Sequence, residues 1–137
     1  MVAKRRFMLD TNIASFIVRG ANEALQARLR AQPIADTCIS SITERELLFG
    51  LAKRPEASAL KTAVHELLHL VEVMPWDSRA AAAYGGLRAT LERQGTPLGN
   101  LDTLIAAHAI ATGSILVTND KALVPTLGLQ AEDWSTP

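Results

Sequence analysis

The chain has 137 residues, of which 48% are hydrophobic and 20% are charged, so it can form one hydrophobic core and is too short for two domains. Fourteen Lys and Arg residues balance fourteen Asp and Glu residues, which excludes a strong overall charge that would attract nucleic acid. The composition also excludes intrinsic disorder, and we expect a single domain over residues 1–137.

Short β-type segments alternate with longer helical patterns along the whole chain. The predicted order is a strand at 6–9, a short helix that ends at Gly20, a helix at 22–32, a strand at 37–40, a helix that begins with the capping box Ser41 and Glu44, a helix at 56–70, a strand at 71–74, helices at 78–94 and 101–112, a strand at 115–118 and an edge strand at 129–131. This alternation is typical of a parallel sheet covered by helices, and we therefore expect an α/β fold.

Three features of the sequence indicate where the protein is located. The mostly apolar stretch 104–117 contains His108 and Gly113 and is shorter than the roughly 18–20 residues that span a bilayer. The single cysteine, Cys38, forms no internal disulfide, and the basic residues near the N-terminus precede an apolar run too short for a secretion signal. We therefore expect a cytoplasmic protein without a membrane segment.

Two carboxylates follow predicted strands. Asp10 comes directly after the strand at 6–9, and Asp120 comes two residues after the strand at 115–118. Ligands of open parallel sheets bind at the carboxyl ends of the strands, near the point where the strand order reverses. Taken singly, each Asp is equally compatible with an ordinary turn or helix-cap residue.

Two further carboxylates lie in predicted helices. Glu46 shares a helix face with Ile42 and with Phe49 or Gly50, and we expect this face to lie toward the sheet. Asp102 opens a helix that is apolar almost all round, and a simple N-cap is the alternative role for this acid. Four such carboxylates would raise one another's pKa unless a cation neutralised them. Hard oxygen ligands without cysteine favour Mg²⁺ or Mn²⁺, the metals of phosphodiester cleavage.

Several segments, in this order, resemble one known family. They are residues 8–12 (MLDTN), 40–47 (SSITEREL), 99–109 (GNLDTLIAAHA), 117–120 (VTND) and the closing 132–134 (EDW). Together they resemble the PIN-domain family and, more closely, the VapC toxins of bacterial toxin–antitoxin modules. The resemblance covers essentially the whole chain, and the ordered set of motifs is far more specific than any one motif.

The resemblance implies a three-layer α/β/α sandwich with a central parallel sheet and a metal-dependent endoribonuclease. It implies an acidic cluster that binds Mg²⁺ or Mn²⁺ and activates water for in-line attack, formed by Asp10, Glu46, Asp102 and Asp120. Asp10 and Asp102 would be the direct ligands, Thr118 would steady the cluster by hydrogen bonding, and Asn12 and Asn119 would lie near it. Glu44 is the competing acid in its segment, but the capping box accounts for it.

The same resemblance implies three partners: an RNA substrate, a cognate antitoxin and a second copy of the chain in a homodimer. Sequence-specific proteins usually read single-stranded RNA loops, so a structured loop is the favoured substrate. The antitoxin would cover the early helices, where the candidate contacts, each also compatible with a core position, are Leu25, Leu29, Phe49, Leu60 and Leu67.

Two alternative functions follow from other features. Residues 65–69 (HELLH) match the zinc-peptidase pattern H-E-x-x-H, but the longer metzincin pattern fails at Glu72 and Pro75, and a solvated helix face is the favoured explanation of the motif. A catalytically inactive PIN-like binding module is the other alternative, and the presence of all four acids argues against it. We expect His108 to be a packed or hydrogen-bonded histidine, and Trp76 and Trp134 to be core or rim aromatics unless they stack on bases.

Overall fold

The computed structural model describes residues 5–96, 98–120 and 128–136. These residues form a parallel sheet in the order β3-β2-β1-β4-β5, whose strands are β1 (Phe7–Leu9), β2 (Thr37–Ser40), β3 (Glu72–Met74), β4 (Ile115–Val117) and β5 (Gln130–Glu132). The helices are α1 (Thr11–Arg19), α2 (Glu23–Ala31), α3 (Ser41–Lys53), α4 (Ser58–Leu70), α5 (Ser78–Arg93) and α6 (Asn100–Thr112), and a 3₁₀ turn covers Ile34–Asp36.

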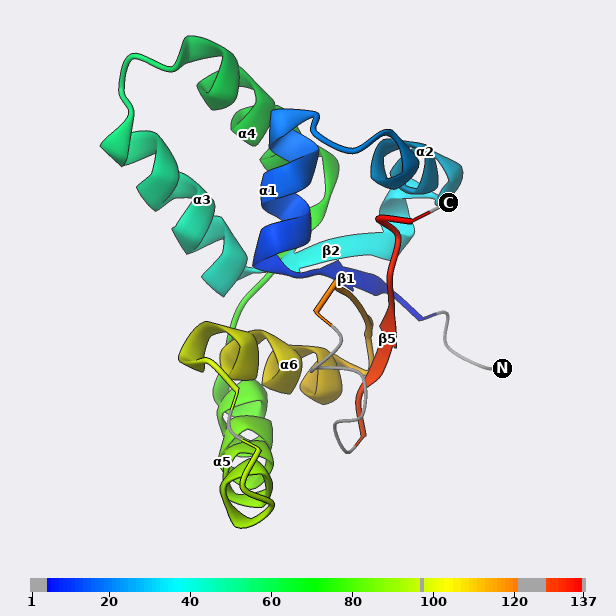
Figure 1. Cartoon of the computed structure of the whole chain (residues 1–137), viewed down its shortest axis with the longest axis vertical. Helices are drawn as coiled ribbons and strands as arrows, with labels where there is room; N and C mark the ends of the chain where they lie inside the picture. The colour runs from blue at the N-terminus through cyan, green and yellow to red at the C-terminus, as the bar shows by residue number, and fades with distance from the viewer. Residues whose placement is uncertain (1–4, 97, 121–127, 137) are drawn as a thin grey trace.

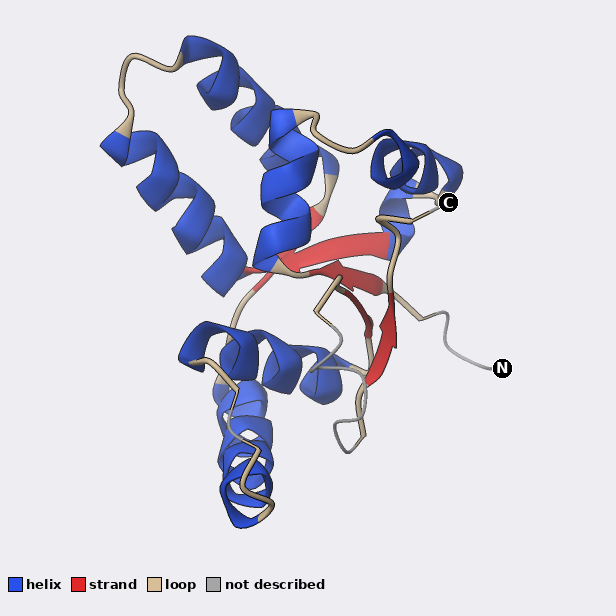
Figure 2. Ribbon diagram, in the orientation of Figure 1, coloured by secondary structure: helices blue, strands red, loops and turns tan. Residues whose placement is uncertain are grey.

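The helices cover both faces of the sheet (Figures 1 and 2). Helices α1 to α4 lie on one face, and α5 and α6 lie on the other. The predicted three-layer α/β/α sandwich with a central parallel sheet is therefore confirmed. Within the described part of the chain, no helix is long and apolar enough to cross a membrane.

Neighbouring residues of the central strands supply the two hydrophobic cores. Met8 and Leu116 pack against α5 and α6, whereas the next residues, Leu9 and Val117, pack against the helices of the opposite face. This follows from strand geometry, since successive side chains point to opposite faces of a sheet. Continuous apolar runs are thus the expected sequence of central strands that are buried on both sides.

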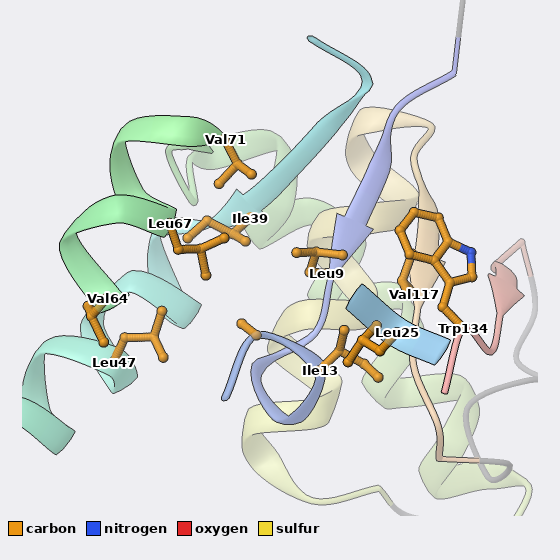
Figure 3. Close-up of a cluster of buried hydrophobic side chains, with 11 residues drawn as sticks. Leu9, Ile13, Leu25, Ile39, Leu47, Val64, Leu67, Val71, Val117 and Trp134 are labelled. Carbon is orange, nitrogen blue, oxygen red and sulfur yellow. The ribbon is translucent and has the colours of Figure 1, made fainter. Parts of the chain in front are cut away.

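Figure 3 shows the core of the α1–α4 face, where Trp134 lies with Leu25 and Val117. The Trp134 ring is fully buried, packs 5.2 Å from the Phe7 ring between centroids, and donates from Nε1 to Glu132 at 3.0 Å. Trp134 is therefore a core residue, which is one of the roles expected for it from the sequence.

The order of the strands creates a switch point beside β1. The chain passes outward from β1 to β2 and β3 and then returns to β4 on the opposite side of β1. Leu9 pairs in register with Val117, so the residues that follow these two strands emerge side by side. This edge is where the fold brings Asp10 and the 118–120 segment together.

Candidate acidic active site

Asp10 is held by its own turn. It is the N-cap of α1, where its carboxylate accepts a hydrogen bond from the Ile13 amide at 2.8 Å, and its backbone amide donates to the Val117 carbonyl at 3.0 Å. An N-cap Asp satisfies an amide that the first helical turn leaves without a partner. The side chain is therefore fixed in place, with only 4% of its surface exposed.

Burial raises the pKa of the Asp10 carboxyl above its ordinary value of 3.8. Hydrogen bonds from Thr118 and from the Ile13 amide lower this pKa, and the negative charges of Asp102 and Asp120 raise it further. Carboxylates close to one another oppose each other's ionisation, and a bound cation removes that opposition. Asp10 is thus a buried acid in a field created by two other acids.

Asp102 lies in the first turn of α6 and is half-buried. The N-cap of this helix is Gly99, which provides no side-chain bond, so the simple N-cap role considered for Asp102 is wrong. Burial raises the pKa of Asp102, and the charge of Asp120 adds to the increase. Asp102 is therefore a half-buried acid whose ionisation is opposed by the charge of Asp120.

Thr118 connects the two acids at the sheet edge. Its hydroxyl oxygen accepts a hydrogen bond from the Asp120 amide at 3.0 Å, and its hydroxyl donates to the Asp10 carboxylate. Thr118 is 2% exposed, whereas Asn12 and Asn119 are exposed beside it. The structure thus places Thr118 between Asp10 and Asp120 and leaves both asparagines open to solvent.

Glu46 lines a cleft formed by residues of α1, α3 and α4. It is on α3, bonded to Arg45 at 3.1 Å, and lines a cleft of about 220 Å³ with Arg19 and Arg54. Among the described residues, the charges that shift the pKa of Asp10 are Asp102 and Asp120, and Glu46 is not one of them. Helix α3 extends away from the sheet beyond its first turn (Figure 1), and the place of Glu46 in the acidic cluster stays a prediction.

The carboxylates at this edge of the sheet are of the type that binds a divalent metal. Asp10 and Asp102 offer hard carboxylate oxygens whose raised pKa values reflect burial and mutual repulsion, which fits Mg²⁺ or Mn²⁺. Within residues 5–96, 98–120 and 128–136, no three Asp, Glu, His or Cys side chains are gathered into a metal-ligating group. The acids fit the metal by chemistry and by mutual charge, without a preformed ligand shell.

The H-E-x-x-H segment lies elsewhere, on α4. His65, Glu66 and His69 are exposed and line a shallow surface with Lys61 and Thr62. The His69 ring bonds through Nδ1 to the His65 carbonyl of its own helix at 2.9 Å. In the part of the chain that the structure describes, no third ligand joins the two histidines. The zinc-peptidase interpretation gains no support from this arrangement.

The candidate antitoxin contacts separate into two groups. Leu25 and Leu67 are core residues, with 0% and 4% of their surfaces exposed, whereas Phe49 is 55% exposed. Leu29 contributes to an apolar groove of about 500 Å³ between α1, α2 and α4, and Leu60 lines the cleft that also contains Glu46. Surface that a partner could cover is therefore present on the α1–α4 face.

One connection of the site is not predictable from the sequence. The Thr11 hydroxyl, next to Asp10, lies 3.0 Å from the Thr43 hydroxyl in the first turn of α3. The two residues are 32 positions apart, and no local pattern indicates that they pair. This bond links the Asp10 turn to the start of α3.

Comparisons with known proteins agree with this architecture. A family model of the PIN domain matches residues 7–125. The tRNA(fMet)-specific endonuclease VapC of Shigella flexneri is 36% identical over 131 residues, which cover 95% of this chain and 98% of that protein. The Ribonuclease VapC2 of Haemophilus influenzae is 31% identical over 94% of this chain and 98% of its own length.

Solved structures show the same similarity. The chain matches the crystal structure of DNA-bound VapBC from Salmonella typhimurium with a TM-score of 0.88 and 36% identity, over 96% of this chain and 99% of that one. VapBC2 from Rickettsia felis, solved bound to a DNA fragment from its promoter, matches with a TM-score of 0.84 and 30% identity, over 93% of this chain and 98% of that one.

Proposed function

This chain belongs to the PIN domain family, and we propose that it is an endoribonuclease that acts as the toxin of a toxin–antitoxin pair. One observation carries the proposal: Asp10, Asp102 and Asp120 come from three separate segments at the switch point of the sheet, where the charges of Asp102 and Asp120 raise the pKa of Asp10 and the charge of Asp120 raises that of Asp102. Relatives that are named as VapC ribonucleases align with nearly the full length of the chain, which supports the same assignment.

We propose further that Asp10 and Asp102 hold Mg²⁺ or Mn²⁺, with Asp120 and Glu46 in the surrounding acidic cluster. When bound, such a cation supplies a Lewis acid that stabilises charge on the phosphoryl group and lowers the pKa of a water molecule. Water, and not the ribose 2′-hydroxyl, is the proposed nucleophile, so the products carry a 5′-phosphate and a 3′-hydroxyl. This mechanism is distinguishable from 2′-hydroxyl attack by mapping product ends.

The protein's own residues orient the acids for this chemistry. The Ile13 amide and the Thr118 hydroxyl both donate to Asp10, so the carboxylate is presented in one orientation. Thr118 also fixes the backbone of Asp120 through its amide. Preorganised groups avoid rearrangement when charge develops on the substrate, which is a main source of catalysis at such sites.

The proposed substrate is a single-stranded loop of a structured RNA. The Shigella flexneri relative is named for its action on tRNA(fMet), and loops expose bases that proteins can read. The overall charge is zero, so contacts with RNA phosphates must be local. Transfer RNA is therefore the first substrate to test.

We also propose a cognate antitoxin and a homodimer. The solved VapBC relatives and the open apolar groove between α1, α2 and α4 support the antitoxin. The homodimer rests on the resemblance to VapC toxins alone. The antitoxin is tested by co-expression with candidate antitoxin proteins, and the homodimer by measuring the mass of the purified protein in solution.

The deciding experiment is cleavage of total tRNA by purified protein free of antitoxin. Wild-type protein with Mg²⁺ or Mn²⁺ is compared with an EDTA-treated sample, a Zn²⁺-supplemented sample and Asp10→Asn. Discrete cuts that require Mg²⁺ or Mn²⁺ and disappear in Asp10→Asn are expected. Activity that survives the substitution contradicts the proposed mechanism, and RNA binding without cleavage under all conditions favours an inactive binding module.

A further inference from the structure

Helix α6 carries Asp102, and among the described residues the side-chain bond from its first turn to another element is that of Asn100, which accepts from the Tyr84 hydroxyl of α5 at 3.4 Å. Gly99 provides no side-chain cap, and the Thr103 hydroxyl donates only to the Gly99 carbonyl of the same turn, at 2.9 Å. The position of Asp102 relative to Asp10 therefore depends on contacts that α6 makes with other elements.

One such contact comes from Trp76 in the loop between β3 and α5. Its indole Nε1 donates to the Leu104 carbonyl of α6 at 3.0 Å, two residues after Asp102. Its backbone amide donates to the Ser41 hydroxyl at the start of α3, also at 3.0 Å. Trp76 thus contacts two helices at once, and each contact is a directional hydrogen bond.

The second contact comes from His108, one helical turn further along α6. Its Nδ1 lies 2.7 Å from the Ser40 hydroxyl at the end of β2, and the Pro75 carbonyl bonds to the ring as well. Burial lowers the pKa of His108, which is 1% exposed, so the ring is neutral. A neutral ring has one donor and one acceptor nitrogen, so it can satisfy both the Ser40 hydroxyl and the Pro75 carbonyl.

These bonds continue to the other side of the site. The Ser40 oxygen also accepts from the Ile42 amide at 3.1 Å and so caps α3, and Thr43 in the same turn reaches Thr11 beside Asp10. The start of α3 is therefore bonded to the Asp10 turn on one side and, through Ser40 and Ser41, to His108 and Trp76 on the other. A continuous hydrogen-bonded path joins the two helices that begin at the acids.

We propose that Trp76 and His108 are positioning residues, which hold α6 against the start of α3 and thereby set the place of Asp102 relative to Asp10. This role rests on the proposed nuclease function. Neither side chain touches the acids, so both act through the helix. Displacement of a catalytic group by about 1 Å costs on the order of 100-fold in rate, so a loosened α6 has a measurable effect.

The test compares full-length Trp76→Phe and His108→Asn with wild type. Phe keeps the ring but removes the Nε1 donor, and Asn keeps a polar group near Ser40 but cannot also reach Pro75. We expect kcat for tRNA cleavage to fall about 10-fold to 100-fold with KM within about twofold. Mn²⁺ binding, followed by electron paramagnetic resonance without RNA, should weaken severalfold in both variants.

Thr112→Ala is the matched control. Thr112 bonds to the His108 and Ala109 carbonyls in the last turn of α6 and to the Ser114 hydroxyl just after it, so its loss destabilises the end of the same helix without touching Ser40, Ser41 or Pro75. Its kcat and Mn²⁺ affinity should equal those of wild type even where its melting temperature falls as far as that of Trp76→Phe.

Three outcomes overturn the proposal. Trp76→Phe and His108→Asn with wild-type kcat and Mn²⁺ affinity refute the positioning role alone, because wild-type cleavage shows that the nuclease function stands. If kcat and Mn²⁺ affinity fall only in proportion to the melting temperature, and fall equally in Thr112→Ala, then both residues have a structural role only. Wild-type protein that neither binds Mn²⁺ nor cleaves RNA refutes the proposed function, and the positioning role with it.

Discussion

Two regions of the molecule contain side chains of the metal-ligating type, and they differ in how the fold treats them. The acids at the sheet edge come from separate segments, and Asp10 is buried and hydrogen-bonded to two partners. His65, Glu66 and His69 lie on one exposed helix face, where His69 bonds to its own backbone. The H-E-x-x-H spacing alone therefore does not make a site, whereas convergence from several elements with shifted pKa values indicates one.

Asp10→Asn, in the acidic region, should cause the largest loss of tRNA cleavage. Asn is as good an N-cap as Asp, so the bond to the Ile13 amide and the fold are retained while the charge is lost. We expect tRNA cleavage to fall at least about 100-fold, because the proposed ligand charge is removed. Circular dichroism and the melting temperature should remain near those of wild type, and a variant that folds and still cleaves would exclude Asp10 from the site.

Thr118→Val should have a smaller effect in the same region. Valine has nearly the same shape as threonine but cannot donate to Asp10 or accept from the Asp120 amide. Loss of a partner that orients a ligand typically costs about 10-fold to 100-fold in activity or metal affinity, and we expect the lower end of that range. Thr118→Ser restores the hydroxyl and should recover most of the activity, and if Val and Ser variants behave alike, the hydroxyl is not what matters.

The sequence predicts the parts of this comparison that depend on local patterns. The strand at 115–118 and Asp10 after β1 were both predictable, because strand ends and cap residues are encoded over a few neighbouring positions. The start of α4 differs from the prediction by two residues: the Ala57 amide bonds to the Arg54 carbonyl in a turn, and the helix begins only at Ser58.

Contacts that depend on how elements pack could not be predicted. The His108 bond to Ser40 joins residues 68 positions apart, and the Trp76 bond to Leu104 joins residues 28 apart. The orientation of Glu46 depends on the direction of the α3 axis, which a helical repeat does not specify. The family resemblance supplies the list of acids, but only the fold shows which of them influence one another.

The buried His108 should make the free energy of unfolding depend on pH. Burial lowers the pKa of His108 below its ordinary value of 6.5, although the charge of Asp77 and the Pro75 carbonyl oppose the shift. The folded state therefore binds the proton less well than the unfolded state. The contribution of the neutral His108 to the free energy of unfolding is present in full above pH 6.5 and is lost as the pH falls below it. Denaturant unfolding at several pH values should show a weaker acid dependence for His108→Asn than for wild type, and identical slopes would contradict the assignment.

The smallest expected effect belongs to the second region and completes the comparison. His69→Ala removes one of the two histidines, yet the ring is exposed and its Nδ1 bond is satisfied within α4. We expect tRNA cleavage, Mn²⁺ affinity and the response to added Zn²⁺ to stay within about twofold of wild type, because the side chain is exposed and lies outside the proposed site. The fold should also be retained, since most surface substitutions change stability by no more than about 0.5 kcal/mol. A large loss of activity in His69→Ala, with Asp10→Asn unaffected, would reverse the assignment and move the chemistry to α4. Because the two variants make opposite predictions in one assay, they decide which region is the site.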